Sequence, residues 1–422
     1  MIWTQPSGDE VTVDSFYDAA IANNLAVAVW RAPGEAATQA VVDLSGFARS
    51  APINFASDQP SFIVAPFVNA DNQSALCIRG DVHLAPDGLR LYRENWNGQR
   101  QTLDRFLADC HSPSHVLYNA WYPPADATYP GQSITQDDYE RLVRSAIEFI
   151  STSSIEKIVV SRMTETPLPA AFDPVATFEH LCASYPRAFV SLVAIPAVGT
   201  WIGASPELLL SVDTEGLSTM ALAGTQAAPL DDNLKSIRWA DKEIEEQALV
   251  SSYIRTFFQD AGIDTVRETG PETVQAGNVV HLQTRFDVAL PRPALQDLAA
   301  LMLTSLHPTS AVCGMPKDKA LAFILANENY DRSFYSGFLG PVNISHQTRL
   351  YVNLRCMQLR NTSASLYVGG GITAVSNPQD EWRETQLKAE TLLRVLRTTH
   401  DLPADSPSVM VPTHSQPATV TS

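Results

Sequence analysis

The sequence is poor in positive charge, and this excludes several classes of ligand. In 422 residues there are 29 Lys and Arg against 46 Asp and Glu, which gives a formal net charge of −17. A chain this acidic has no general attraction for phosphate backbones or anionic lipid, so we expect neither nucleic acid nor a membrane surface as a partner. If the ligand is an anion, a few local cations or a metal ion must hold it.

The sequence also lacks a cysteine framework and a long apolar run. Its five cysteines are far apart and form no CxxC pair, so neither disulfides nor a zinc ribbon is indicated. The acidic beginning, MIWTQPSGDEVTVD, is unlike a secretory signal. No segment approaches the ~20 apolar residues that span a bilayer. We therefore expect a cytoplasmic protein with reduced thiols.

Three regions differ in character along the chain. Residues 1–130 contain short apolar runs between Pro, Gly, Asn and Asp, which predict strands and turns that complete the same body. Residues 131–400 carry the polar motifs, and helical periodicity alternates there with β-branched runs. Residues 401–422 are rich in Pro, Ser and Thr, which predicts a disordered tail.

Local patterns in the middle region predict individual elements. Amphipathic spacing predicts four helices, at residues 135–153, 241–258, 295–305 and 381–396. The run RLYVNLRCMQL (349–359) alternates with a period of two, so we expect one strand that pairs as a hairpin with SLYVGGG (365–371). Mixed helices and strands without strict alternation are typical of an α+β fold.

Two of these helices carry acidic residues at helical spacing. Glu381, Glu384 and Lys388 share one face of the last helix, and Glu243 and Glu246 share a face of another. Such residues are usually solvated. If the two acidic faces met, however, their carboxylates could hold a hard divalent cation such as Mg²⁺, which prefers oxygen ligands.

Two further residues could act as an acid and a base. Glu207 follows Pro206 at a strand end, and a carboxyl group in a desolvated pocket has a raised pKa and can donate a proton. Lys157 begins an apolar strand, where burial would lower its pKa until it could accept a proton. A surface Glu and a solvated strand-end Lys are the alternatives.

Three consecutive glycines, Gly369, Gly370 and Gly371, follow a strand without the GxGxxG order of a dinucleotide site. Their N–H groups could bind a carboxylate as a nest, or they could form a hairpin corner. No HxxxH or HExxH spacing occurs, so His281 and His307 are interpreted as packing residues and not as zinc ligands.

Taken together, these motifs resemble the chorismate-binding enzymes, which include anthranilate synthase, aminodeoxychorismate synthase, salicylate synthase and isochorismate synthase. The matching segments occur in the order of the family over residues 135–397. They are KIVVSR (157–162), GASPELL (203–209), ALAGT (221–225), KEIEEQALV (242–250), LHPTSAVCGMPK (306–317), YDRSFYSGFLG (330–340), LRCMQL (354–359), YVGGGIT (367–373) and EWRETQLK (381–388).

The resemblance implies a fold, a substrate and a cofactor. The fold would be a large α/β (α+β) sandwich of two antiparallel-rich sheets with outer helices and a site in the cleft between them. The substrate would be chorismate, and the protein would be a monomer. Mg²⁺ would be bound directly by Glu246 and Glu384, and through waters by Glu243 and Glu381. The family usually has His where this chain has Gln247, which affects the support of the site.

Within the family, the motifs are most similar to isochorismate synthases, which serve menaquinone or siderophore biosynthesis. Aminodeoxychorismate synthases carry a nucleophilic Lys where this chain has Ala223, and water-using members keep a lysine at the place of Lys157. The resemblance thus implies an isomerase that adds water at C2 of chorismate and expels the C4 hydroxyl. A salicylate synthase, which KEIEEQ also resembles, and a non-catalytic chorismate-binding protein are the alternatives.

The resemblance also implies roles for individual residues. Lys157 would be the base that activates water, and Glu207 the acid that protonates the leaving hydroxyl. The remaining site residues would contact the substrate, namely Gly224, Thr225, Thr309, Arg355, Gly369, Gly370, Gly371 and Lys388.

Overall fold

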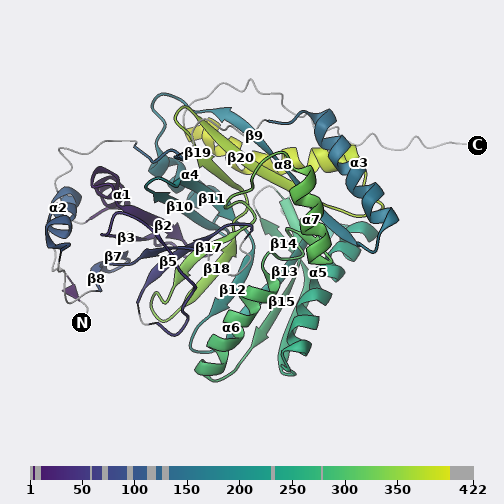
Figure 1. Cartoon of the computed structure of the whole chain (residues 1–422), viewed down its shortest axis with the longest axis horizontal. Coiled ribbons are helices and arrows are strands. Elements are labelled where there is room, and N and C mark those ends of the chain that lie inside the picture. Colours follow the sequence, from purple (N-terminus) through teal and green to yellow (C-terminus); the bar gives the residue numbers. More distant parts are fainter. Residues whose placement is uncertain are drawn as a thin grey trace, which may run out of the picture.

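Two large β-sheets pack face to face, and helices cover their outer surfaces (Figure 1). The structure is a computed structural model that describes residues 3–4, 11–57, 59–68, 75–92, 98–111, 120–125, 133–229, 233–276 and 279–399. Within these ranges, the paired strands run antiparallel. The expected sandwich of two antiparallel sheets with outer helices is therefore confirmed.

The first sheet, sheet A, contains eleven strands among the described residues. In spatial order they are β1 (Trp3–Thr4), β8 (Gly88–Leu91), β7 (Val82–Ala85), β3 (Gln39–Asp43), β2 (Ala26–Arg31), β10 (Phe189–Ile195), β11 (Gly199–Ser205), β19 (Cys356–Leu359), β20 (Ser363–Ile372), β9 (Lys157–Pro167) and β16 (Gly314–Met315).

The second sheet, sheet B, contains nine strands in the same described ranges. In spatial order they are β14 (Val266–Ala276), β15 (Val279–Val288), β13 (Leu217–Ala227), β12 (Leu208–Val212), β18 (Thr348–Val352), β17 (Phe338–Val342), β5 (Ser61–Ala65), β6 (Leu76–Arg79) and β4 (Arg49–Ser50).

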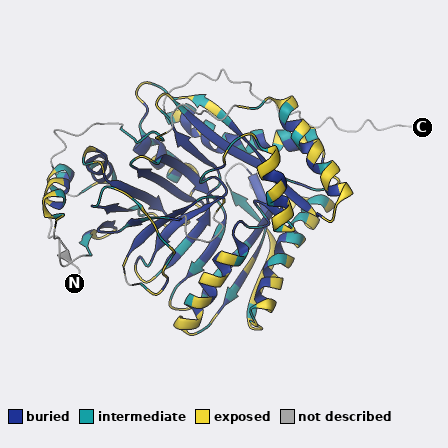
Figure 2. Cartoon of the chain, in the orientation of Figure 1, coloured by how far each residue is buried: buried dark blue, intermediate teal, exposed yellow. Residues whose placement is uncertain are grey.

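The helices bury one face against a sheet and leave the other in solvent (Figure 2). Three of them pack on the outer face of sheet A, namely α1 (Val13–Ala22), α4 (Pro174–Ser184) and α8 (Pro378–Thr399), and α2 (Arg100–His111) packs against α1. Sheet B is covered by α5 (Asp241–Asp260) and α6 (Arg292–Leu306). The helices α3 (Gln136–Thr152) and α7 (Lys317–Asn327) pack against β9.

A third apolar layer fills the space between the sheets. In β2, Val27 and Val29 face the helices, whereas Trp30 joins the cluster that contacts sheet B. Within that cluster the rings of Phe189 (β10) and Tyr351 (β18) stack with centroids 4.1 Å apart. Because alternate side chains of a strand point to opposite faces, both faces of β2 are buried. This central layer holds the two sheets in a defined position.

Several predicted elements agree with the structure, and others were not predicted. The helices expected at 135–153 and 241–258 correspond to α3 and α5. The side chain of Thr135 caps α3 by accepting the N–H of Asp138. The helices α1, α2, α4 and α7 were not predicted. The N-terminal region therefore contains helices as well as the expected strands.

The single strand expected over 349–359 is wrong. The chain forms β18 in sheet B, turns at Arg355 with φ of +49°, and continues as β19 in sheet A. The hairpin between β19 and β20 is present. The alternation of apolar residues continues through the break because both halves are sheet strands, so periodicity alone cannot show that they belong to different sheets.

Strands from the first hundred residues extend both sheets: β2 pairs with β10, and β5 pairs with β17. The division into regions 1–130 and 131–400 stays a prediction. Residues 401–422, the predicted tail, lie outside the described residues. No helix in the described part of the chain combines the length and the apolar content needed to cross a bilayer.

Candidate active site

A cavity of about 650 Å³ lies between the two sheets, close to two places where the chain passes from one sheet to the other. One crossing, Pro206–Glu207, joins β11 of sheet A to β12 of sheet B. The other joins β18 to β19 and contains Arg355. Glu207 and Arg355 both line the cavity. The backbone crossings thus carry polar side chains into the space between the sheets.

Glu207 is a buried carboxyl group with a raised pKa. Glu207 is 5% exposed, and its backbone oxygen accepts a hydrogen bond from the N–H of Val352 in β18. Burial raises the pKa of Glu207 to about 7, although the charges of Lys157 and Lys388 oppose this rise. At neutral pH the group is therefore protonated in a large fraction of molecules and can donate a proton.

Lys157 is buried behind the cavity wall and contacts Glu246, which lines the cavity. The residue is 1% exposed, and its Nζ is 2.8 Å from Oε1 of Glu246 on α5. Burial alone would raise the pKa of Glu246, but the Lys157 ammonium group lowers it overall. The solvated strand-end lysine considered above is thus excluded by the structure.

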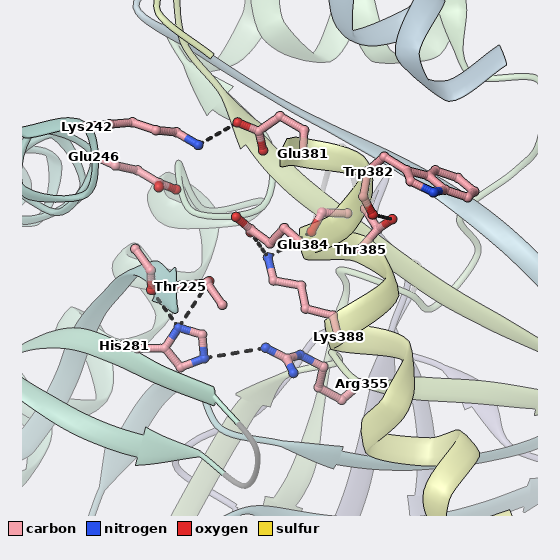
Figure 3. Close-up of polar contacts among 12 residues, drawn as sticks. Thr225, Lys242, Glu246, His281, Arg355, Glu381, Trp382, Glu384, Thr385 and Lys388 are labelled. Atoms are coloured by element: carbon pink, nitrogen blue, oxygen red, sulfur yellow. Dashed lines mark hydrogen bonds and ion pairs between the residues drawn. The ribbon is translucent and has the colours of Figure 1, made fainter. Parts of the chain in front are cut away.

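Helices α5 and α8 bring carboxylates and ammonium groups together on one side of the cavity (Figure 3). Lys242 Nζ lies 2.5 Å from Glu381 Oε1, and Lys388 Nζ lies 2.6 Å from Glu384 Oε1. Lys388 also donates to the backbone oxygen of Gly369 at 2.9 Å. The charges of Glu381, Glu384 and Glu246 all raise the pKa of Lys242. The two acidic helix faces therefore do meet.

Glu381 is the most deeply buried of these acids. Burial and the nearby charge of Glu384 raise its pKa to about 7, against the opposing effect of Lys242. Its Oε2 is buried and has no hydrogen-bond partner among the described residues. Among the described residues, no set of three or more His, Cys, Asp or Glu side chains is already disposed to hold a metal ion. The carboxylates are paired with lysines in this arrangement.

The glycine run lies inside strand β20, opposite β9, and forms neither a loop nor a hairpin corner. A Cβ at position 370 would lie 3.0 Å from Glu381 Oε2, and one at 371 would lie 2.5 Å from Glu246 Oε1. Real Cβ atoms essentially never approach to 2.5 Å. These glycines therefore make room for the carboxylates of α5 and α8, a role that the sequence did not indicate.

His281 links the cavity wall to Arg355. Its Nδ1 lies 2.8 Å from the oxygen of Gly224, and its Nε2 lies 3.4 Å from Arg355 Nη2. Burial and the Arg355 charge lower the pKa of His281 to about 3, so the ring is neutral, its Nδ1–H donates, and Nε2 can accept. Arg355 also donates to Thr391 at 3.2 Å, and burial lowers its pKa to about 10. Its guanidinium thus has only neutral hydrogen-bond partners.

The other predicted site residues divide into two groups. Gly224, Thr225, Lys388 and the three glycines line the cavity, as do Glu207, Glu246 and Arg355. Thr309 lies instead at a smaller cavity of about 300 Å³, which Glu207 also lines, and its hydroxyl is buried without a partner. Glu243 accepts the N–H of Ala240 at 3.1 Å, which caps the start of α5. Its carboxylate is therefore engaged by the helix end.

Gln247 does not support the acidic cluster. Its side chain is buried and donates to Thr284 at 3.0 Å and to the oxygen of Ala221 at 3.3 Å, both in sheet B. Position 247 therefore anchors α5 to the sheet. Reasoning from the sequence missed Lys242 and the cavity position of His281. Lys242 precedes Glu243 in a motif already quoted, whereas the partners of His281 lie 57 and 74 residues away along the chain.

The fold and the cavity define a class of protein: an α/β protein with a cavity between two antiparallel sheets. The sequence model described as "Chorismate binding enzyme" matches residues 94–397. The chain therefore belongs to the chorismate-binding enzyme family.

Individual relatives agree with this family. The chain is 30% identical over 265 residues to the isochorismate synthase EntC of Escherichia coli, covering 62% of this chain and 67% of that protein. It is 27% identical over 275 residues to the isochorismate synthase DhbC of Bacillus subtilis, covering 63% and 69%. The solved structure of MenF, the menaquinone-specific isochorismate synthase of E. coli, superposes with a TM-score of 0.76 at 22% identity and covers 94% of each chain. That likeness shows a shared fold.

Proposed function

We propose that this protein is an isochorismate synthase, an isomerase that converts chorismate to isochorismate with the help of Mg²⁺. The observation that carries the proposal is a buried acid, Glu207, that lines the cavity, together with a buried amine, Lys157, that contacts Glu246 in the wall of the same cavity. Ala223 contributes only a methyl group to that cavity. Position 223 therefore cannot supply the lysine nucleophile that an aminodeoxychorismate synthase carries at this place. Water is left as the nucleophile. The relatives named isochorismate synthase support the same conclusion.

The reaction exchanges one hydroxyl for another. Water forms a bond to C2, the two ring double bonds shift, and the C4–O bond breaks. Lys157 takes a proton from the attacking water, and Glu207 gives a proton to the leaving hydroxyl, so one water enters and one leaves. Positioned acids and bases of this kind each contribute roughly 10²–10⁴-fold. Lys157 must be uncharged to act, and in this structure its Nζ is paired with the carboxylate of Glu246. The base becomes available when Glu246 is engaged elsewhere.

The carboxylates of the substrate need cationic partners in this acidic protein. Arg355 is buried, lines the cavity and contacts only neutral groups, so it can offer a bidentate fork to the enolpyruvyl carboxylate. Lys388, Gly224, Thr225 and the glycines of β20 are proposed to contact the remaining substrate atoms, and Thr309 to act from behind Glu207.

The donor set fits a hard divalent cation. Mg²⁺ prefers oxygen ligands and keeps several waters, and Glu381 presents a buried oxygen to which no group in the described part of the chain donates a hydrogen bond. We propose Glu246 and Glu384 as direct ligands, with Glu381 and Glu243 acting through waters. When bound, the ion would offset the charge of the ring carboxylate. Lys242 and Lys388 hold Glu381 and Glu384 in place before that.

Incubation of the pure protein with chorismate and Mg²⁺ tests the proposal. We expect isochorismate to accumulate until equilibrium is reached, without pyruvate. Formation of salicylate and pyruvate with no added lyase would show a salicylate synthase instead. Binding of chorismate without turnover would show a non-catalytic binding protein. Both results would overturn the proposal.

We further propose a monomer that works in the cytoplasm for menaquinone or siderophore biosynthesis. The free state of all five cysteines supports a reducing compartment.

A further inference from the structure

A second cavity of about 1060 Å³ adjoins the catalytic cavity. Pro206 and Arg355 line both, so the two spaces meet at the crossings between the sheets. The outer cavity is also lined by residues 184–188, which connect α4 to β10, and by Thr391 of α8. It therefore leads from the surface loops to the guanidinium of Arg355.

The charge of this outer cavity differs from that of the whole protein. Among the residues that the structure describes, those that line it include two arginines, Arg187 and Arg355, and no Asp or Glu, although the chain carries a net charge of −17. Arg187 is exposed, and it makes no hydrogen bond or ion pair with any residue in the described ranges. Other arginines of the protein, such as Arg79 and Arg332, form ion pairs with carboxylates. Arg187 is free to meet a ligand.

We propose that the outer cavity is the access route of the substrate and that Arg187 captures a substrate carboxylate there before Arg355 receives it. The inference rests on the proposed function, because it requires a substrate with two carboxylates. Arg187 is a capture residue and takes no part in the chemical step.

A capture residue offsets the electrostatic repulsion between the substrate and the acidic protein. A dianion that approaches a protein of net charge −17 is repelled over most of the surface. Charges of one sign gathered in a cleft focus the field and raise association rates. Since the Debye length is about 8 Å at physiological ionic strength, a local arginine acts strongly only at its own opening. A carboxylate held at Arg187 is thus already in the cavity that Arg355 also lines.

The test compares Arg187→Gln with wild type in steady-state isochorismate formation at about 20 mM and about 300 mM ionic strength, where screening differs strongly. We expect kcat/KM of the variant to fall about three- to tenfold at low ionic strength, with kcat within about twofold of wild type and a smaller difference at high ionic strength. Arg187→Glu should show a larger loss of kcat/KM, and Arg187→Lys should recover most of it.

Arg105→Gln is the matched control. It removes the same charge from an exposed position on α2, which packs on α1 (Figure 1). Neither helix contributes a residue to the lining of the two cavities, and we expect wild-type kinetics. Equal kcat/KM for wild type and Arg187→Gln at both ionic strengths would overturn the inference while leaving the proposed function intact. If wild type turns over no chorismate, the proposed function fails. The association rate of chorismate, followed by stopped-flow tryptophan fluorescence, then decides the inference by the same comparison: a salt-dependent loss in Arg187→Gln supports it, and equal rates or no binding overturn it.

Discussion

Replacement of Glu207 by Gln tests the proposed acid directly. The substitution keeps the size and hydrogen-bonding shape of the side chain but removes the proton that the leaving hydroxyl needs. We expect turnover of Glu207→Gln to fall by about 10²–10⁴-fold, the range typical of a positioned general acid. The binding of chorismate should change little because Arg355 and the lysines remain.

The raised pKa of Glu207 determines what fraction of the side chains carries the proton needed for catalysis. A pKa of about 7 leaves about half of the Glu207 side chains protonated at neutral pH, whereas a pKa of 4.5 would leave roughly 0.3%. The environment thus increases the population of the active acid by about two orders of magnitude. The rise corresponds to about 3 kcal/mol, at about 1.4 kcal/mol per pKa unit.

The same shift predicts a dependence of stability on pH. Because the folded-state pKa is raised, the folded protein binds this proton more tightly than the unfolded chain does. The resulting stabilisation is present below pH 4.5 and is lost as the pH rises through about 7. Relative to wild type, Glu207→Gln should therefore gain up to about 3 kcal/mol in free energy of unfolding near pH 8, and little near pH 4.

The assay is the rate of isochorismate formation across the pH range, together with denaturant unfolding at both pH values. Wild-type kcat should decline on the alkaline side as Glu207 loses its proton, with an apparent pKa near 7. Unchanged turnover in Glu207→Gln would refute the assignment of the acid. Glu245→Gln, which changes an exposed carboxylate on α5, serves as the control and should match wild type.

Three further changes probe the lysine and carboxylate cluster. Lys157→Met removes the proposed base, so turnover should fall by about 10²–10⁴-fold while calorimetry still detects chorismate binding; near-normal turnover would contradict the role. Gly371→Ala would place a Cβ 2.5 Å from Glu246 Oε1 and 2.7 Å from Lys157 Cε, so we expect loss of most activity in the same assay, and an active variant would contradict the tight packing. Lys242→Met leaves Glu381 buried without its cation, which should cost about 1–3 kcal/mol of unfolding free energy in a chelator. Added Mg²⁺ should recover part of that loss in denaturant melts, and no recovery would argue against the metal site.

Local signals in the sequence were sufficient for much of the fold. The 3.6-residue spacing of α3, α5 and α8 and the apolar run of β10 identify these elements because their burial follows a regular period. The break at Arg355 was not predictable in this way, because the residues on both sides of it alternate in the same manner while pairing with different sheets.

The site shows the same limit. Glu381, Glu384 and Lys388 are close in sequence, so helical spacing places them on one face. The contacts that define their charge state join distant segments: Lys242 to Glu381 over 139 residues, for example. Neither residue spacing nor composition predicts such pairings between distant segments. The family resemblance supplied the identity of the acids and helical spacing indicated Lys388 beside Glu384, whereas the pairing of Lys242 with Glu381 became visible only in three dimensions.

The two crossings between the sheets have a mechanical consequence. Glu207 and Arg355 each sit where the backbone leaves one sheet for the other, so a shear of one sheet over its neighbour would shift both side chains at once. A molecule held by both residues would in turn resist that sliding. Bound ligand should therefore slow amide hydrogen exchange in the strands that flank the crossings, far beyond the atoms it touches.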